Sequence, residues 1–425
     1  MHIRKFTFTF VLAIFMFVTL NVYAQEAENL AIVVNGLRKP EAGILPSLSI
    51  VNLDEPNLKK AVENEIIPLG LVIPSDLEVQ GNLLYVLLQE PDPFFDPRGG
   101  SIEIINLLTR SNVGSIPIDS DTTPKQIVLI PPSKAYVTGL YSNVIYVVDL
   151  NQKSVVKRIP CGPMPDGITV LNGKAYVANS AYAKEPGTWN ISYDDTSNVT
   201  VIDTETDTVI KTIPMPINTN GITSDSVSRV IAVSAGIGGW NPQGPIPGTV
   251  VFIDAVTDEV EKTIELETRA GGPTIDSMKR VFISSGGLLV YDLVSEVWTH
   301  DADNPFTDLG GVGAIDQNDN LYIARADWTG GRMDELYVVA PDGTLLNTYG
   351  VGPGASLVTV AQVQSIGVAA ANVNHDGVVN ILDLVLVASN FGQTGRNLQG
   401  DVNRDGIIDV FDLVRIAKYF GQDVN

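Results

Sequence analysis

The sequence predicts an all-β seven-bladed β-propeller followed by a small all-α domain built on two calcium loops. Three observations lead to this prediction: a strand-rich unit recurs along residues 30–363, two acidic loops lie near the C-terminus, and an apolar helical segment follows each loop. We expect the chain to divide into a signal peptide (1–24), the propeller (25–363), a short linker (364–370) and a calcium-binding module (371–425).

The N-terminus has the features of a secretory signal peptide. Arg4 and Lys5 give it a basic start, residues 6–20 are apolar apart from threonines, and Ala24 occupies the −1 position of a cleavage site. A membrane anchor is the alternative, but about 15 apolar residues are short for a membrane span. We expect export by the bacterial Sec route, a secreted or cell-surface location, and no membrane span in the mature chain.

Composition excludes several classes of function. A net charge of −22 argues against a nucleic-acid partner, because phosphates would be repelled. Cys161 is the only cysteine, so neither an internal disulfide nor a thiolate metal cluster can form, and we expect it to be a buried apolar residue. After signal cleavage only His300 and His375 remain, which excludes a histidine-rich zinc site.

One unit of short strands recurs seven times at a spacing of about 40 to 55 residues. A strong copy reads "GKAYVANS" and, after an insertion, "SNVTVIDTETDTVIKTIPM" (173–215). Runs of β-branched and aromatic residues alternate with Gly, Asn, Asp and Pro, which predicts four strands per unit and hence propeller blades. The equivalent strand positions are Ile32, Tyr85, Tyr136, Tyr176, Ile231, Phe282 and Tyr322.

An acidic or amide residue closes the third strand of most units. It recurs as Asp149, Asp203, Asp254 and Asp292, with Asn106 and Asn52 in weaker copies. A ring of ligands is one interpretation. Hydrogen bonding to the backbone of the following hairpin turn is the better one, because Asp and Asn favour such turns.

The first unit lacks an inner strand, whereas a spare strand, "ASLVTVAQ" (355–362), follows the last unit. We expect these two to pair, which would close the ring and leave no open sheet edge. Together with "AYVTG", "AYVAN", "VVDLNQKSVVKRI" and "VIDTETDTVIKTI", this pattern resembles the YVTN-repeat family of seven-bladed β-propellers. The resemblance implies an extracellular or surface-layer location and a role in interaction.

The C-terminal loops have the spacing of a calcium loop, with ligands at positions 1, 3, 5, 7, 9 and 12 and glycine at position 6. Gly377 and Gly406 occupy position 6, and the segments 382–392 and 411–421 are predicted helices that end near Gly392 and Gly421. The predicted ligands of loop 1 are Asn372, Asn374, Asp376, the Val378 carbonyl, Asn380 and Asp383, and those of loop 2 are Asp401, Asn403, Asp405, the Ile407 carbonyl, Asp409 and Asp412. We expect two Ca²⁺ sites, the second being stronger because it has more carboxylates.

The two loop–helix units form a tandem duplication that resembles a type I dockerin, an EF-hand-like module, over about residues 371–422. Dockerins bind a cohesin and tether secreted, often carbohydrate-active, proteins to a scaffold. The resemblance therefore implies a cohesin-like or cell-surface partner. The positions that would contact it are Ile381, Leu382, Val410 and Phe411, which are apolar where many dockerins have Ser-Thr.

Long insertions between the second and third strands are expected to lie on the same propeller face as the entries to the inner strands. They contain Trp189, Trp240 and Trp328, and aromatic side chains beside carboxylates and amides suit a glycan or a peptide. Alternatively, these aromatics pack the loops themselves. The entries to the inner strands, which would ring the axis, include Asp76, Lys125, Asp166, Asn220, Gly272, Gly311 and Ser356.

Two functions remain open. The first is a secreted, non-catalytic recognition or adhesion protein, with a propeller binding face and a calcium-dependent docking tail. The second is a polysaccharide-active enzyme, a lyase or an O-glycosyl hydrolase, docked through the same tail. Histidine is scarce and no G-x-S-x-G, H-E-x-x-H or phosphate-loop motif is present, so the sequence favours binding over catalysis.

Overall fold

The computed structural model describes residues 27–425 except 194–195, 240–243, 328–333, 365–367, 396–397, 403–405 and 423–425. The predicted signal peptide, 1–24, therefore lies outside the described residues. The chain divides between Gln364 and Ser365 into two compact units. No helix in the described ranges is long and apolar enough to cross a membrane.

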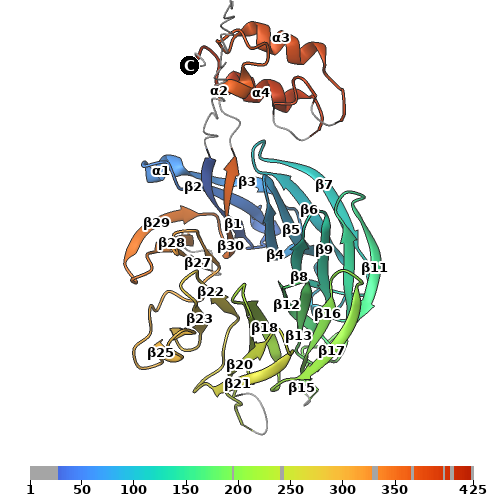
Figure 1. The fold of residues 1–425 in the computed structure, drawn as a ribbon, viewed down its shortest axis with the longest axis vertical. Helices are drawn as coiled ribbons and strands as arrows, with labels where there is room; N and C mark the ends of the chain where they lie inside the picture. The colour runs from blue at the N-terminus through green and yellow to red at the C-terminus, as the bar shows by residue number, and fades with distance from the viewer. Residues whose placement is uncertain are drawn as a thin grey trace, which may run out of the picture. The chain divides into compact units, whose positions relative to one another are not determined.

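Residues 27–364 form seven four-stranded antiparallel sheets, the blades of a propeller (Figure 1). The first blade contains β1 (Ala27–Asn35), β2 (Ser47–Asn52), β3 (Val62–Pro68) and β30 (Ala355–Gln364). The second contains β4 (Ile73–Gln80), β5 (Leu83–Gln89), β6 (Gly100–Asn106) and β7 (Ser111–Ile118), and the third β8 (Pro124–Ile130), β9 (Lys134–Gly139), β10 (Val144–Asp149) and β11 (Ser154–Pro160). Short helices η1 (Pro40–Ala42) and α1 (Leu58–Ala61) lie within the first blade's connections.

The remaining four blades follow in chain order. The fourth contains β12 (Pro165–Leu171), β13 (Lys174–Asn179), β16 (Asn198–Asp203) and β17 (Thr208–Pro214), with an inserted hairpin of β14 (Tyr182–Lys184) and β15 (Ile191–Tyr193). The fifth contains β18 (Thr219–Ser224), β19 (Arg229–Ser234), β20 (Thr249–Asp254) and β21 (Glu259–Glu265), and the sixth β22 (Pro273–Ile275), β23 (Arg280–Ser284), β24 (Leu288–Asp292) and β25 (Val297–His300). The seventh contains β26 (Ala314–Ile315), β27 (Leu321–Arg325), β28 (Asp334–Val339) and β29 (Leu345–Val351). The predicted seven blades are confirmed.

The ring closes as predicted, through pairing of the last strand with the first. β30 is antiparallel to β1, with Leu30 opposite Ala361 and Ile32 opposite Thr359. The buried carboxylate of Asp334 accepts hydrogen bonds from the backbone N–H groups of Gly354 and Ala355, which fixes the entry into β30. The first blade therefore depends on both ends of the propeller sequence.

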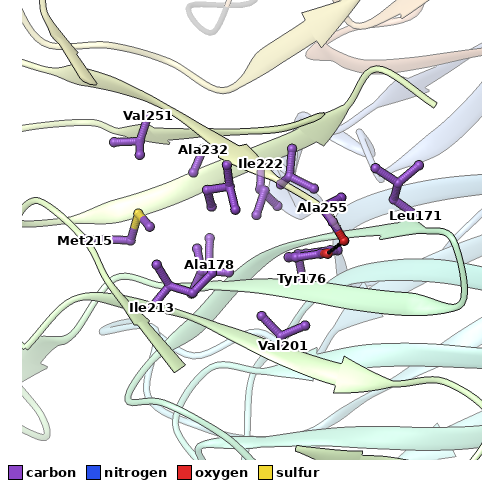
Figure 2. Packing of buried hydrophobic residues seen from close by; sticks show 13 residues of the cluster. Leu171, Tyr176, Ala178, Val201, Ile213, Met215, Ile222, Ala232, Val251 and Ala255 are labelled. Atoms are coloured by element: carbon purple, nitrogen blue, oxygen red, sulfur yellow. Dashed lines mark hydrogen bonds between the residues drawn. The ribbon is translucent and has the colours of Figure 1, made fainter. Parts of the chain in front are cut away.

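The core lies between neighbouring blades rather than within one sheet. Figure 2 shows such a cluster, in which Leu171, Tyr176 and Ile213 of the fourth blade face Ile222 and Val251 of the fifth. Alternation along each strand places one set of side chains against the preceding blade and the other set against the following blade. Cys161 packs at the edge of another such cluster, where burial raises its thiol pKa to about 12.

The "KAYV" segments connect adjacent blades. Lys174 Nζ donates to both carboxylate oxygens of Asp258 at 2.8 and 2.9 Å, and Tyr176 Oη donates to Asp258 Oδ1 at 2.6 Å. Tyr176 also donates to the Ala255 carbonyl, the bond drawn in Figure 2. Lys134 and Tyr136 contact Asp207 of the next blade in the same way. We call each Lys–Tyr–Asp set an inter-blade latch.

The residue that closes the third strand caps the following turn, as predicted. Asp149 Oδ1 accepts the N–H groups of Asn151 and Gln152, both at 2.9 Å. The same pair of turn bonds recurs at Asp203, Asp254, Asp292 and Asn106, and Asn52 makes one. These side chains stabilise hairpins and do not converge into a ligand ring.

The second unit contains α2 (Val368–Ala371), α3 (Ile381–Ser389) and α4 (Val410–Lys418). α3 and α4 each begin one residue before the predicted start, because Asn380 and Asp409 act as N-caps, and each ends before the predicted glycine. The predicted linker 364–370 overlaps β30 at Gln364 and α2 from Val368.

Backbone hydrogen bonds tie the two halves of this unit together symmetrically. Val379 of the first half exchanges bonds with the segment after α4, at 2.8 Å to Gly421 and 2.9 Å to Gln422. Ile408, its equivalent, bonds at 2.7 and 2.9 Å to the segment after α3. Val379, Val387, Ile408 and Ile416 are fully buried. Each half thus completes the other, as the duplication predicts.

Candidate functional site

Loop 1 of the second unit is fastened by the carboxylate at position 12. Asp383 is fully buried, its Oδ1 accepts the Asn374 N–H at 3.0 Å, and its Oδ2 accepts the Asn380 N–H at 2.8 Å. Asn380 Oδ1 in turn accepts the Leu382 N–H at 2.8 Å, and Asn380 and Asp383 form a capping box at the start of α3. The helix N-terminus therefore fixes the end of the loop.

The other predicted ligands of loop 1 converge on Asp376. Its Oδ2 lies 2.8 Å from Asn374 Nδ2 and 3.2 Å from Asn380 Nδ2, and the latter lies 3.1 Å from the Val378 carbonyl. Asn372 Oδ1 accepts the Asp376 N–H at 3.1 Å. Hydrogen bonds, first from the Val378 N–H and then from Asn374, lower the Asp376 pKa. The structure thus places positions 1, 3, 5, 7 and 9 together.

Loop 2 repeats the arrangement around its own position 12. Asp412 is fully buried, and its two oxygens accept the N–H groups of Val402 at 2.6 Å and Asp409 at 2.8 Å. Asp409 Oδ1 accepts the Phe411 N–H at 2.8 Å, which gives α4 the same capping box.

The first half of loop 2 is only partly described. Asp401 Oδ2 accepts the N–H of Gly406 at 3.0 Å, which brings position 1 onto the turn at position 6. The predicted ligands Asn403 and Asp405 lie outside the described residues. Ile407, which would offer its carbonyl, follows the turn with an exposed side chain.

The donor chemistry of both loops fits calcium. Every predicted ligand is a carboxylate, amide or carbonyl oxygen, and calcium takes six to eight such oxygens with flexible geometry. In the part of the chain that the structure describes, no three His, Cys, Asp or Glu side chains form a metal-binding group. Loop 1 would therefore rely on amide and carbonyl oxygens beside its two carboxylates, which fits a site weaker than loop 2.

The predicted partner-binding positions lie largely on the surface of the second unit. Ile381, Leu382 and Val410 are 58%, 56% and 51% exposed, whereas Phe411 is half-buried. Further apolar residues, exposed in matched pairs on the two halves, are Val385 with Val414 and Phe391 with Phe420. Exposed apolar clusters of this kind are typical of protein-binding surfaces.

In the propeller, the four side chains predicted at the axis meet in one cavity. Asp76, Lys125, Asp166 and Asn220 all line a space of about 570 Å³, which we call the axial cavity. Its other lining residues include Gly272, Gly311 and Ser356, as expected from their places at the inner strands.

Burial controls the acids of the axial cavity. It raises the Asp76 pKa to about 7, although the Ile127 N–H at 2.9 Å and Lys125 act in the opposite direction. Burial also raises the Asp166 pKa, against Lys125. Glu78, two residues after Asp76 on β4, has its pKa raised to about 8 by burial and then by Asp76. The sequence did not single out Glu78, although its alternation with Asp76 on one strand face was the available signal.

A second, more apolar cavity adjoins the axial cavity. It measures about 480 Å³ and is lined by Phe94, Phe95, Tyr141, Tyr182 and Trp189, and we call it the aromatic cavity. The Trp189 ring centroid lies 6.1 Å from Phe94 and 5.5 Å from Phe95. The aromatics therefore pack against one another and also line a space. Tyr141, from the β9–β10 turn, was not expected.

An ion pair anchors the wall of the aromatic cavity. Lys184 of β14 is buried and pairs with Asp96 in the insertion after β5. This pair joins insertions from the second and fourth blades. Trp240 and Trp328, also predicted for this face, lie outside the described residues.

The two cavities share one wall, formed by Ser75, Lys125, Ser356 and Leu357. Neither His300, on the outermost strand β25, nor His375, in loop 1, lines either cavity. The shared space offers carboxyls, amides, a lysine and aromatic faces.

No protein-family model matches the chain. No curated protein matches it either. Among solved structures the chain is similar to Kuenenia stuttgartiensis hydrazine synthase, with 17% identical residues, a TM-score of 0.47, and coverage of 68% of this chain and 95% of that one. At this identity and TM-score, the likeness says nothing about what this chain binds or does.

Proposed function

We propose that the chain is a secreted, non-catalytic recognition protein whose propeller binds a ligand and whose tail docks, with calcium, to a cohesin-like or cell-surface protein. The observation that carries this proposal is the duplicated loop–helix unit, in which Asp383 and Asp412 each fasten a loop of oxygen donors to a helix. The resemblance to dockerins and the exposed apolar pairs on and just after α3 and α4 support a docking role.

Recognition rather than catalysis is supported by the contents of the cavities. Their polar groups can donate and accept hydrogen bonds and their aromatic faces can stack, but no histidine and no nucleophile–base pair lies among their lining residues. One observation favours the second candidate, a polysaccharide lyase or hydrolase: the raised pKa values of Asp76 and Glu78 would suit a general acid. If the purified chain steadily released reducing ends or unsaturated sugars from polysaccharides, the non-catalytic proposal would be overturned in favour of the enzyme.

Calorimetry of the full chain tests the calcium sites. We expect two binding events, and Asp412→Asn should remove the tighter one because it takes a charge from the stronger site. Asn372→Asp should tighten the weaker site about tenfold, since it adds a carboxylate where Asn372 already accepts a loop N–H. Glu205→Gln, at an exposed propeller turn, is the control. Equal calcium binding by wild type, Asp412→Asn and Asn372→Asp would contradict this assignment.

The docking proposal is tested by measuring the binding of the full chain to a panel of cohesins, in calcium and in chelator. We expect a calcium-dependent complex that the double variant Ile381→Lys, Val410→Lys loses while it keeps both calcium events, because the lysines replace exposed apolar contacts only. Val256→Lys, at a residue that is 75% exposed on the propeller, should leave the complex intact. Binding that persists in chelator would rule out calcium-dependent docking.

A further inference from the structure

The axial and aromatic cavities adjoin but differ in chemistry. Asp76 and Asp166 line the axial cavity, whereas the aromatic cavity is lined by five aromatic residues and several aliphatic ones. Lys125 and three uncharged residues, Ser75, Ser356 and Leu357, form the boundary. A ligand that fills both spaces must therefore carry two different groups close together.

The charges around the axial cavity favour a cation. Asp76 and Asp166 line it and Glu78 lies beside Asp76, whereas Lys125 is the one cation among the described residues that line it. Lys184, on the aromatic side, is already paired with Asp96. When the three acids are ionised, the carboxylates outnumber Lys125, and a bound cation would offset both their mutual repulsion and the energetic cost of burying their charge.

The axial cavity has room for a long side chain beside Gly272. Six of its lining residues are glycines. A Cβ placed on Gly272 would meet no atom within 4 Å, and the backbone there is not left-handed. Gly272 therefore opens onto free space that a ligand can occupy.

We propose that the propeller face binds an extended peptide segment in which a basic side chain enters the axial cavity and a neighbouring large apolar side chain packs against Trp189 in the aromatic cavity. This inference rests on the proposed recognition function and names its ligand. Adjacent side chains of a peptide differ in chemistry, as the two cavities do, whereas a neutral polysaccharide offers similar units to both. Trp189 is 59% exposed, so its ring is available for packing or for contact with the cation.

The test uses fluorescein-labelled, end-blocked hexapeptides with a central Phe-Arg or Arg-Phe, and matched peptides with Gln for Arg or Gly for Phe. Fluorescence anisotropy with the full chain should show binding of at least one Phe/Arg order. Each replacement should weaken that binding at least about tenfold, since each empties one cavity. Equal binding of the Arg and Gln peptides, or no binding by either order, would overturn the proposal.

Variants locate the site. Asp166→Asn and Trp189→Ala should each weaken binding about tenfold, and Gly272→Leu should abolish it by filling the cavity. Gly239→Leu is the matched control, because Gly239 is exposed, lies outside both cavities and also has open space at its Cβ. Unchanged affinity in Gly272→Leu and Asp166→Asn, with native circular dichroism spectra, would place the peptide elsewhere and overturn the site.

Binding should also tighten as pH rises from 5 to 8. The charged groups near Asp76 are Lys125 on β8, Glu78 on β4 and Asp166 on β12, while β5 and β30, which pack against β4, carry none. Ionisation of the acids over this range strengthens attraction for arginine. Cello- and chito-oligosaccharides form the competing arm: if they bind in the cavities and the peptides do not, recognition stands and the peptide inference fails.

Discussion

Asp76 lies in a cavity wall where burial holds its carboxyl close to neutrality. Its pKa of about 7 compares with 3.8 for an ordinary aspartate, because the ionised form loses hydration that Lys125 and the Ile127 N–H only partly replace. Such a residue lowers stability whenever it is charged, which is typical of residues kept for binding rather than for folding.

The stability of the propeller should therefore depend on pH through Asp76. The pKa of Asp76 is higher in the folded state than in the unfolded state. Its contribution to the free energy of unfolding is therefore complete below about pH 4 and is lost as pH rises through about 7. Asp76→Asn should leave the free energy of unfolding unchanged at pH 4 and raise it by about 1–2 kcal/mol at pH 8. This gain is smaller than the full pKa shift implies, because water in the cavity screens the charge.

Thermal and denaturant unfolding of the full chain at the two pH values measure this effect. Glu205→Gln, at an exposed turn, should show no such difference. An Asp76→Asn variant that is less stable than wild type at pH 8 would contradict the assigned cause.

At the scale of strands, the two inter-blade latches join the third blade to the fourth and the fourth to the fifth. Each latch joins the second strand of one blade to the hairpin turn of the next, as Lys174 and Tyr176 do with Asp258. Asp258 is buried, so its hydrogen bonds are largely shielded from water.

Removing one latch should loosen one blade interface. Tyr176→Phe and Asp258→Asn should each cost about 1–2 kcal/mol, with a coupling energy of about 1 kcal/mol in the double variant. Tyr176→Phe combined with Lys60→Ala, at an exposed position of α1, should be additive. Denaturant midpoints give all these values, and full additivity of the latch pair would show that the bond adds no stability.

The elements that follow local rules could be predicted from the sequence. The turn-capping Asp149 and the two loop–helix units depend on spacing within one unit, and β30 could be identified as a spare strand after the last blade. The latches and Tyr141 could not be predicted, because they depend on which side chains of different units meet, whereas Glu78 could have been found from its alternation with Asp76 on β4. The predicted starts of α3 and α4 are one residue late, because Asn380 and Asp409 cap the helices in addition to occupying position 9 of the loops.

At the scale of the whole molecule, the two units should be separable. A chain that ends after Gln364 retains all seven blades, so we expect a soluble propeller with an unchanged far-ultraviolet β spectrum in calcium or in chelator. A chain that ends at Gly354 lacks β30, and its unpaired β1 should cause aggregation. Circular dichroism and light scattering compare the two chains, and a folded, monomeric product without β30 would show that closure is dispensable.

The pairing of β1 with β30 also sets the timing of folding during synthesis. β1 is the first strand of the propeller to leave the ribosome and β30 is the last, so the first blade stays incomplete while the other six are made. Contacts between residues so far apart in sequence form slowly. A chain delivered in N-to-C order thus remains unclosed until translation has passed Gln364, and prematurely terminated chains keep an exposed strand that proteases and chaperones can recognise.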